Sequence, residues 1–417
     1  MRYDTIITGG GLSGLMAGIA LAKQGQQVAI LAKGISRLYY NSGSLELMGR
    51  DLDGNEVTRP LEAIAALPPS HPYSRVTDVA ARAAQAREIL EEAGVKVRGN
   101  LRRNHYRVTP TGLLKPAWLT LDDYLRIDNR EQLPWQRATV FNVKGFLDFP
   151  DHFVAAGMRR LGVDCDCKDI TTPQIERRRA TPGEMRSTAL ARTLESDAAL
   201  VSLAAKINSH TDDDSQAILF PALLGLDDDK ASRRLRRLLD GQLYLVPTLP
   251  ASVGGTRIHT LLRKHFVSLG GTYMLGSAVT SGSIDPLSCR VLGIKARNLP
   301  DQVIRANHYL LASGSFMSGG LIATHDRVVE PIFGLDVDAP RGRDAWTREY
   351  LYDRQPYMEF GVATDEQLHP LHDGKPVPNL WAAGSILAGN SPIALGNTTG
   401  LSMLTALEAA AGITSSQ

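Results

Sequence analysis

The chain has 417 residues, of which 43% are hydrophobic and 22% charged, and its formal net charge is +2. This length favours two domains, or one domain with a large insertion, over a single small core. A net charge near zero gives no general attraction to polyanions, so nucleic acid is not an expected partner. The three cysteines, Cys165, Cys167 and Cys289, are too few for a disulfide framework or for an iron–sulfur cluster held by this chain alone.

No segment of the sequence predicts a membrane span. Residues 1–31 are rich in apolar side chains, but Asp4, Lys23 and Gln24 interrupt them and four glycines mark a turn, so the segment is interpreted as part of the fold and not as a signal peptide. Residues 380–411 are the nearest approach to a long apolar run, and Gly, Ser and Asn punctuate them. We expect any membrane association to come through a partner or a surface.

The N-terminus predicts the first strand–helix–strand unit of a dinucleotide-binding fold. A β-prone run at 5–8 leads into a glycine turn, which is followed by an apolar helix at 15–24 and a second strand at 28–31. In a Gly-x-Gly-x-x-Gly turn the first glycine permits the tight turn, the second lets the backbone approach a phosphate and the third lets the helix pack on the strand. Free N–H groups at the start of the helix then hold the anion. The alternative is a glycine turn without a ligand. The expected cofactor contacts are Gly9, Gly10, Gly11, Leu12, Ser13 and Gly14.

The remaining pattern predicts an α/β, Rossmann-like flavoprotein fold of the glutathione-reductase type with a large inserted mixed α/β domain. The flavin-binding domain is expected to comprise residues 1–60 and 255–417, and the insert residues 61–254. Within the insert we expect helices at 78–93, 184–207 and 228–239, and strands at 217–220 and 243–246 that each end before a proline. After it we expect a helix at 258–269, strands at 272–275, 291–296 and 308–312, a turn at Gly314 that contacts the cofactor, and a last helix at 400–411.

The end of the second strand bears on the kind of nucleotide. An acidic residue about 20 positions after the glycine turn normally holds the ribose hydroxyls of an adenosine. Here Ala32 and Lys33 occupy that place. A flavin mononucleotide has no adenosine ribose and would not need the carboxylate, so we expect FMN, with FAD as the alternative; Lys33 could pair with a phosphate.

Two further segments suggest contacts with the flavin ring. In the polar loop at 39–45 the candidates are Ser42, Gly43 and Ser44, although an ordinary turn stabilised by serine hydroxyls explains these residues equally well. Residues 379–385 resemble a second flavin signature, in which Gly384 is followed by Ser385 where an acidic residue usually holds the ribityl chain.

A C-terminal glycine loop opens the last helix. The positive end of that helix would stabilise the anionic reduced flavin at the pyrimidine side of its ring. A glycine-rich helix start packed in a core is the alternative. The residues of this loop expected to contact the cofactor are Gly396, Asn397, Thr398, Thr399 and Gly400.

No residue pattern points to a metal. His369 and His372 lie in a proline-flanked loop, and Cys165-x-Cys167 lacks the CxxC spacing of a redox pair, so no metal is assigned. Arginines available for a substrate phosphate are Arg257 at a predicted helix start and Arg341, or Arg343, in a Gly/Pro loop.

Several segments resemble one family over essentially the whole chain, and LVPTLPASVGG and ASGSFMSGGL are more specific than any glycine fingerprint. The others are RYDTIITGGGLSGLMAG, SGSLEL, FPALLGLDD and FGVATDE. The family is the B subunit of anaerobic glycerol-3-phosphate dehydrogenase. The resemblance implies an FMN-containing subunit of a three-subunit complex that oxidises sn-glycerol 3-phosphate to dihydroxyacetone phosphate. It further implies a flavoprotein A subunit, an iron–sulfur, membrane-associated C subunit that passes electrons to quinone and then to fumarate or nitrate, and a cytoplasmic position peripheral to the inner membrane.

The sequence does not identify a catalytic base, and the A subunit could itself oxidise the substrate. Two other functions therefore stay open. The chain could be a non-catalytic assembly or electron-relay subunit of the complex, as Ala32 and Ser385 suggest. It could also be a stand-alone FAD-dependent oxidase or dehydrogenase, which sustained turnover by the isolated chain would support.

Overall fold

The computed structural model describes residues 2–181 and 185–416, which fold as two compact units. The first unit contains the N-terminal segment up to Arg37, Glu46–Ala93 and the chain from Leu262 onward. The second contains Leu38–Leu45 and Gly94–Leu261. The chain thus leaves the first unit twice and returns to it each time.

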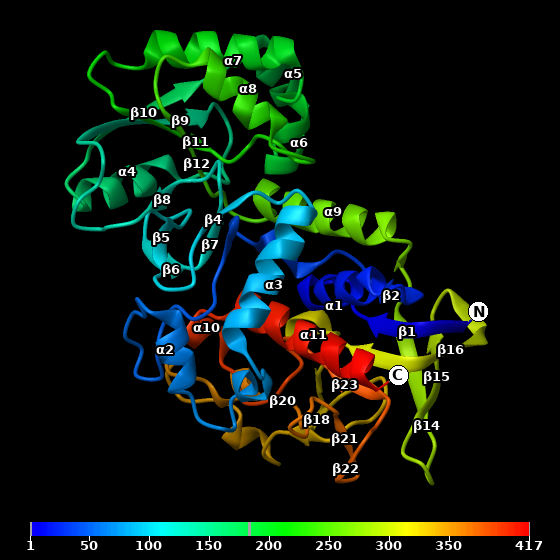
Figure 1. The fold of residues 1–417 in the computed structure, drawn as a ribbon. Coiled ribbons are helices and arrows are strands. Elements are labelled where there is room, and N and C mark those ends of the chain that lie inside the picture. The colour runs from blue at the N-terminus through cyan, green and yellow to red at the C-terminus, as the bar shows by residue number, and fades with distance from the viewer. Residues whose placement is uncertain (1, 182–184, 417) are drawn as a thin grey trace. The chain divides into compact units, whose positions relative to one another are not determined.

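The first unit is organised by one seven-stranded sheet (Figure 1). Its parallel part has the order β13-β2-β1-β16, and β23 pairs with β16 in the same direction. Every residue of β2 is buried, as expected for a strand at the centre of a parallel sheet that is covered on both faces. The strands are β1 (Arg2–Thr8), β2 (Val28–Ala32), β13 (Thr272–Leu275), β14 (Val279–Ile284), β15 (Val291–Ala296), β16 (Leu299–Leu311) and β23 (Leu380–Ala382).

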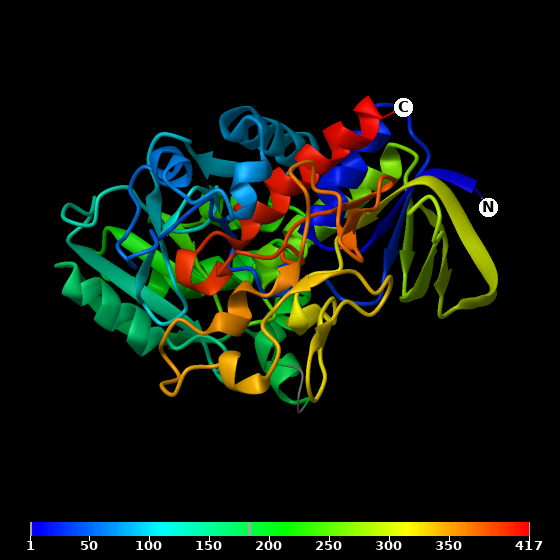
Figure 2. The same cartoon turned by 90° about the horizontal axis from the view of Figure 1, so that it is seen from below.

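The long strand β16 belongs to two kinds of pairing. Its first half pairs antiparallel with β15, which continues to β14, and its last residues pair in parallel with β1. This β14–β15–β16 meander extends away from the parallel strands in both views (Figures 1 and 2). The end of β16 therefore lies directly beside the end of β1.

The helix α1 (Leu12–Lys23) lies in the interior of the first unit, since every residue from Leu12 to Ala22 is buried. α1 contacts both α11 (Thr398–Ser415) and α3 (Val79–Glu92), and α1 and α11 lie side by side in Figure 1. α3 begins at Asp78, whose side chain accepts a hydrogen bond from the N–H of Ala81. The other helices are α2 (Pro60–Ala65), α10 (Pro392–Leu395) and α9 (Val253–Ser268), which starts in the second unit and ends in the first.

Short two-stranded ribbons and 3₁₀ turns complete the first unit. The ribbons pair β17 (Ile322–Ala323) with β18 (Val328–Val329), β19 (Val337–Asp338) with β20 (Gly361–Val362), and β21 (Leu371–His372) with β22 (Lys375–Pro376). They connect β16 to β23 and so fill the long interval between the two strands that carry the turn at Gly314 and the loop at Gly384.

The second unit has its own parallel sheet in the order β10-β9-β11-β12. Two three-stranded antiparallel sheets, β3-β7-β4 and β6-β5-β8, accompany it. The strands are β3 (Ser44–Leu45), β4 (Val97–Gly99), β5 (His105–Val108), β6 (Leu114–Ala117), β7 (Leu119–Leu121), β8 (Arg126–Ile127), β9 (Arg137–Val143), β10 (Asp164–Ile170), β11 (Ala217–Pro221) and β12 (Leu243–Val246). The helices are α4 (Asp151–Arg160), α5 (Pro173–Arg179), α6 (Ser187–Thr193), α7 (Asp197–His210) and α8 (Lys230–Leu238).

The expected Rossmann-like α/β fold is confirmed, but the unit boundaries differ from the expected 61–254 insert. Residues 61–93 belong to the first unit, because α3 packs on α1 and α11. Residues 38–45 belong to the second unit, because β3 pairs with β7.

The single helix expected at 184–207 is also different. It is two helices, α6 and α7, because the side chain of Ser196 caps the start of α7 by accepting a hydrogen bond from the N–H of Ala199. The expected starting residue Glu184 lies outside the described residues.

Candidate functional site

The loop between β1 and α1 has the geometry of a nucleotide-binding turn. Gly9 has φ +120°, and a Cβ on it would lie 2.1 Å from the carbonyl oxygen of Ala312. A Cβ on Gly14 would lie 1.9 Å from the carbonyl oxygen of Gly9. Any side chain at these two positions would collide with backbone, so the turn and the helix packing both require glycine.

Gly11 differs from these two glycines. Its backbone is extended at φ −86°, and a Cβ placed on it would meet only Ser36 Oγ, at 3.8 Å. Glycine is therefore not needed for packing within the chain at this position, and the backbone of Gly11 faces open space. This is the arrangement that lets a phosphate approach the main chain.

The start of α1 is available to an anion. Gly11 is its N-cap, no side chain in the described part of the chain caps it, and its first turn contains no acidic residue. The N–H groups of a first helical turn have no partner inside the helix and carry the positive end of the helix dipole. The residues present at this turn therefore fit a phosphate group.

The C-terminal loop after β23 lies against this same turn. Gly384 has φ +79°, and a Cβ on it would lie 2.2 Å from Ser13 Oγ in α1 and 3.5 Å from Ser402 Oγ in α11. Its N–H donates to Thr405 Oγ1 at 2.9 Å. Segments about 370 residues apart in sequence thus meet at one point, and Ser385 follows there with its side chain half-buried.

The turn after β16 supplies another polar group. Gly314 has φ +78° and follows Ser313, whose hydroxyl is buried and has no hydrogen-bond partner among the described residues. A Cβ on Gly9 would lie 3.2 Å from the backbone nitrogen of Ser313, so this turn is next to the first glycine loop. We name the set formed by the loop at 9–14, the turn at 313–314, the loop at 384–385 and the start of α11 the glycine-loop site.

Comparison with known proteins identifies the family of the chain. A family model for the FAD binding domain matches residues 4–401. The B subunit of anaerobic glycerol-3-phosphate dehydrogenase from Yersinia pseudotuberculosis serotype I (strain IP32953) is 39% identical over 413 residues, which cover 98% of this chain and 97% of that one. The protein of the same name from Vibrio vulnificus (strain YJ016) is 33% identical over 422 residues, 98% of this chain and 95% of that one. The chain belongs to the family of anaerobic glycerol-3-phosphate dehydrogenase B subunits.

Solved structures with a similar fold are more distant from this member of the B-subunit family. A flavocytochrome c3 fumarate reductase in an open conformation matches with a TM-score of 0.47 at 10% identity and covers 99% of this chain and 78% of that chain. A 3-ketosteroid dehydrogenase of Rhodococcus jostii RHA1 matches with a TM-score of 0.43 at 12% identity and covers 100% of this chain and 97% of that chain.

The start of α11 is hydrogen-bonded to Glu46, a residue that the sequence did not mark as part of the site. The carbonyl oxygen of Glu46 accepts the N–H of Gly400 at 2.7 Å, and its carboxylate accepts the hydroxyl of Thr399 at 3.1 Å. Asn397 is the N-cap, without a side-chain cap of its own, and Gly396 before it has φ +56°. Among these residues Thr398 is half-buried at the first position of the helix. The expected loop is thus a helix start that is fixed by Glu46.

A buried polar cluster lies directly before α11 and was also missed. His71 Nδ1 accepts the N–H of Tyr73 at 3.1 Å, and His71 Nε2 lies 3.0 Å from Asn390 Oδ1. Asn397 Nδ2 donates to the same oxygen at 2.8 Å, while Asn397 Oδ1 is buried without a partner among the described residues. Burial lowers the pKa of His71 to about 4, so the ring is neutral at pH 7 and Nε2 is the donor. No local sequence motif predicts the hydrogen bonds of His71 and Asn397 with Asn390, because His71 is more than 300 residues away from the other two.

The other expected cofactor residues have different surroundings. Lys33 is exposed just after β2, and its Nζ lies 3.4 Å from the position of a Cβ on Gly319. Ser42, Gly43 and Ser44 belong to the second unit, where Ser42 Oγ accepts from Arg107 and Ser44 Oγ lies 2.9 Å from Thr120 Oγ1. Gly10 packs under Tyr273, whose hydroxyl donates to its carbonyl oxygen at 3.1 Å.

Of the two arginines expected to bind substrate phosphate, Arg257 has a different role. It is 3% exposed and forms an ion pair with Asp123 at 2.9 Å. Its remaining donors reach the carbonyl oxygens of Gly225 at 2.6 Å and Leu224 at 2.9 Å. The expectation that Arg257 binds a substrate phosphate is therefore wrong. Its guanidinium group is buried in the second unit and is bound by Asp123 and by backbone carbonyl oxygens. Arg341 is exposed in the loop of the first unit before Arg343, which stacks over Trp346.

The two neighbouring cysteines are not suited to nucleophilic or redox chemistry. Burial raises the pKa of Cys165 to about 12 and of Cys167 to about 11, so neither thiol is activated. Asp151, His152 and Cys167 form a group of three possible metal ligands, in which His152 is exposed.

Within residues 2–181 and 185–416 no helix is long and apolar enough to cross a membrane.

Proposed function

We propose that this chain is the flavin-binding subunit of a quinone-linked glycerol-3-phosphate dehydrogenase complex, in which sn-glycerol 3-phosphate is oxidised to dihydroxyacetone phosphate. The observation that carries the proposal is the contact between the two glycine loops, Gly384 against Ser13, beside the open position at Gly11. A bound flavin would supply the two-electron acceptor for this oxidation.

Different residues of the glycine-loop site would bind different parts of the flavin. The backbone of Gly11 and the first turn of α1 would hold its phosphate. Ser313 and Ser385 offer hydroxyl groups to its polar chain, and the start of α11 at Asn397 would stabilise negative charge on the ring. The candidates Ser42, Gly43 and Ser44 remain a proposal for contacts with the ring.

We favour FMN over FAD as the bound flavin. β2 ends at the buried residue Ala32, so no carboxylate stands at the position that usually holds the adenosine ribose. The next side chain is the cation Lys33, which suits a phosphate better than a ribose hydroxyl. Since the matched family model is one for an FAD binding domain, FAD is the alternative that the experiment must exclude.

The partners follow from the same proposal. They would be a flavoprotein A subunit and an iron–sulfur, membrane-associated C subunit, with this chain in the cytoplasm and peripheral to the inner membrane through them. Electrons would pass to quinone through the C subunit, since three cysteines cannot ligate a cluster in this chain.

The experiment is to purify the chain alone and together with its partner subunits, release the bound cofactor and identify it by mass. The proposal expects one FMN per chain, lost in Gly11→Glu, which places a carboxylate where the phosphate would lie. Ser268→Glu adds the same charge at the exposed end of α9 and should keep the flavin. FAD would overturn the argument from Ala32, and an empty site in every preparation would overturn the proposal.

A second candidate is a non-catalytic assembly or electron-relay subunit of the same complex. Ala32 and Ser385, which replace the usual acidic residues, favour it. If the reconstituted complex containing Gly11→Glu lacks this chain's flavin, assembles normally and oxidises sn-glycerol 3-phosphate at the wild-type rate, the chain is an assembly subunit. If the complex assembles but loses both this chain's flavin and the activity, the chain takes part in electron transfer, as the catalyst or as a relay.

A further inference from the structure

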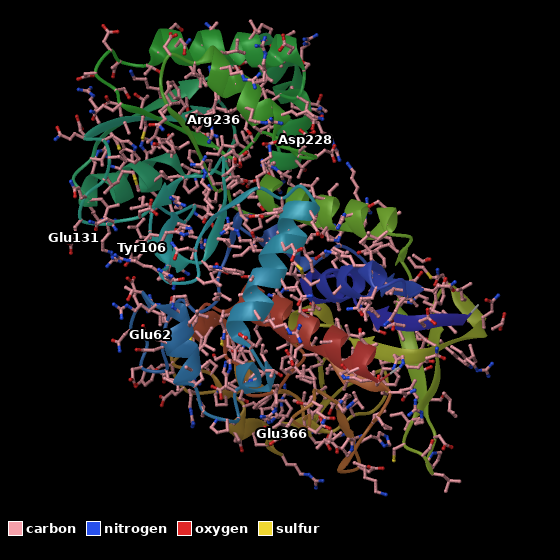
Figure 3. All side chains as sticks on the ribbon, viewed as in Figure 1. Glu62, Tyr106, Glu131, Asp228, Arg236 and Glu366 are labelled. Atoms are coloured by element: carbon pink, nitrogen blue, oxygen red, sulfur yellow. The ribbon has the colours of Figure 1, made fainter. Side chains whose placement is uncertain are left out.

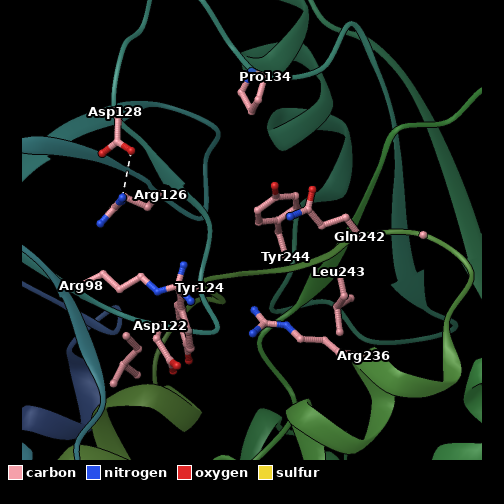
Figure 4. A pocket seen from close by; sticks show the side chains of 12 residues that line it. Arg98, Asp122, Tyr124, Arg126, Asp128, Pro134, Arg236, Gln242, Leu243 and Tyr244 are labelled. Carbon is pink, nitrogen blue, oxygen red and sulfur yellow. Dashed lines mark hydrogen bonds and ion pairs between the residues drawn. The ribbon is translucent and has the colours of Figure 1, made fainter.

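A cavity of about 420 Å³ lies entirely within the second unit (Figure 4). Its polar lining comes from β4, the segment before β8, α8 and the start of β12, and none of the residues of the glycine-loop site lines it. This volume is in the range of pockets that bind small molecules. The polar side chains used below are Arg98, Asp122, Arg126, Arg236, Gln242 and Tyr244.

Three arginines line this cavity, and two of them are unpaired. Arg126 donates to Asp128 at 2.9 Å. By contrast, Arg98 and Arg236 make no ion pair or side-chain hydrogen bond with any residue in the described ranges. Arg98 extends from β4, and Arg236 extends from α8, where Figure 3 labels it. Their side chains approach the centre of the cavity from opposite sides (Figure 4). Two unpaired guanidinium groups that face one space are suited to an anion with two negative charges.

A carboxyl group lies between these two arginines. The pKa of Asp122 is raised by burial and by the nearby carboxylates of Asp123 and Asp229, against the opposing effect of Arg236 and Arg98. Its carboxyl oxygens can accept hydrogen bonds from the hydroxyl groups of a ligand. Its single carboxylate cannot balance the two positive charges of Arg98 and Arg236.

Uncharged polar groups also line the cavity. Gln242 and Tyr244 belong to the segment that enters β12, and both line the cavity. The ring of Tyr244 packs against Trp135, with 5.8 Å between ring centroids. An amide and a phenol together can donate to, and accept from, alcohol groups.

We propose that this cavity binds a small hydroxylated phosphate monoester, with Arg98 and Arg236 on the phosphate and Asp122, Gln242 and Tyr244 on the hydroxyl groups. The inference goes beyond the proposed function, because it assigns a binding site in the second unit that shares no residue with the glycine-loop site. Glycerol carries no charge and would use neither of the two unpaired guanidinium groups.

The test is isothermal titration of the purified flavin-loaded chain with sn-glycerol 3-phosphate, inorganic phosphate and glycerol. We expect sn-glycerol 3-phosphate to bind at least tenfold more tightly than phosphate, and glycerol not to bind. Arg98→Gln and Arg236→Gln should each weaken this binding at least tenfold, or remove one ligand per chain from the stoichiometry. Arg237→Gln is the matched control: it is the next residue of α8, exposed, and outside the cavity lining.

Tyr244→Phe gives a second, milder variant, which removes one hydroxyl and keeps the ring on Trp135. It should weaken binding of sn-glycerol 3-phosphate severalfold and leave binding of phosphate unchanged. Equal affinity for phosphate and sn-glycerol 3-phosphate would overturn the assignment to a hydroxylated ester. Unchanged affinity and stoichiometry in both arginine variants would overturn the site. Flavin content, measured in the same samples, reports on the proposed function separately.

Discussion

Gly384 and Ser13 are in contact so close that a single methyl group on Gly384 would lie 2.2 Å from the serine hydroxyl. The loop after β23 is therefore seated on the first turn of α1. This contact joins the C-terminal and N-terminal glycine segments within the first unit, and both the stability of that unit and its proposed flavin site depend on it.

Gly384→Ala should destabilise the protein and empty the flavin site. Alanine at φ +79° is strained, and its methyl group would force the side chain of Ser13 to move. Gly374→Ala is the control, because Gly374 has φ +74° but nothing within 4 Å of its Cβ position. We expect Gly384→Ala to lower the free energy of unfolding by about 2 kcal/mol more than Gly374→Ala in urea titrations. Equal effects of the two variants would mean that the contact does not matter.

The buried histidine near α11 predicts a pH dependence. Because burial lowers the pKa of His71 from 6.5 to about 4, the unfolded chain binds more protons than the folded one between these values. Stability from this group is complete above pH 6.5 and falls as the pH drops toward 4. At pH 5 the loss is about 2 kcal/mol relative to pH 7.5.

Urea unfolding at pH 7.5 and pH 5 checks this expectation in the wild type and in His71→Asn. The variant should be less stable at pH 7.5 but should lose about 2 kcal/mol less on acidification. His105, whose pKa burial also lowers to about 4, acts in the same direction and remains in both proteins. His325→Asn, at an exposed position, should retain the wild-type dependence. An unaltered pH dependence in His71→Asn would contradict the argument.

Much of the first unit can be predicted from its sequence, because local signals determine it. The turn at Gly9 to Gly14 and the buried run of β2 are fixed by short motifs, and β13 and β15 have the expected bounds. β10 was missed because it carries alternating charges such as Asp166 and Lys168, which pair with neighbouring side chains at the edge of its sheet.

The parts that could not be predicted depend on contacts between distant segments. His71 and Asn390 are 319 residues apart, and nothing near either one indicates that they share a hydrogen bond. Arg257 looked available for a phosphate because the sequence does not reveal that Asp123, 134 positions away, is buried beside it. The division at 93 rather than at 60 has the same origin, since α3 packs on helices from both ends of the chain.

The buried ion pair between Arg257 and Asp123 in the second unit leads to a prediction about stability alone. Arg257→Met would leave Asp123 as an unpaired charge that is only 1% exposed, so we expect a loss of about 3–5 kcal/mol in urea unfolding. Arg186→Gln breaks an ion pair in which the arginine side chain is 71% exposed, and it should cost less than about 1 kcal/mol. Similar costs for the two variants would show that Arg257 is not the buried anchor that its contacts indicate.

A substitution at Ser313 tests flavin binding separately from folding stability. Its hydroxyl is buried beside the first glycine loop without a hydrogen-bond partner among the described residues, and an unsatisfied buried hydroxyl costs about 1–3 kcal/mol. Ser313→Ala should therefore leave the melting temperature of the flavin-free protein unchanged or raise it. The same variant should release flavin several times faster than the wild type, because a polar atom of the flavin loses its partner. Ser13→Ala is the variant with which the melting temperature and the rate of flavin release are compared, because Ser13 packs directly on Gly384. A Ser313→Ala protein that keeps its flavin as tightly as the wild type would remove this hydroxyl from the proposed site while leaving the glycine contacts in place.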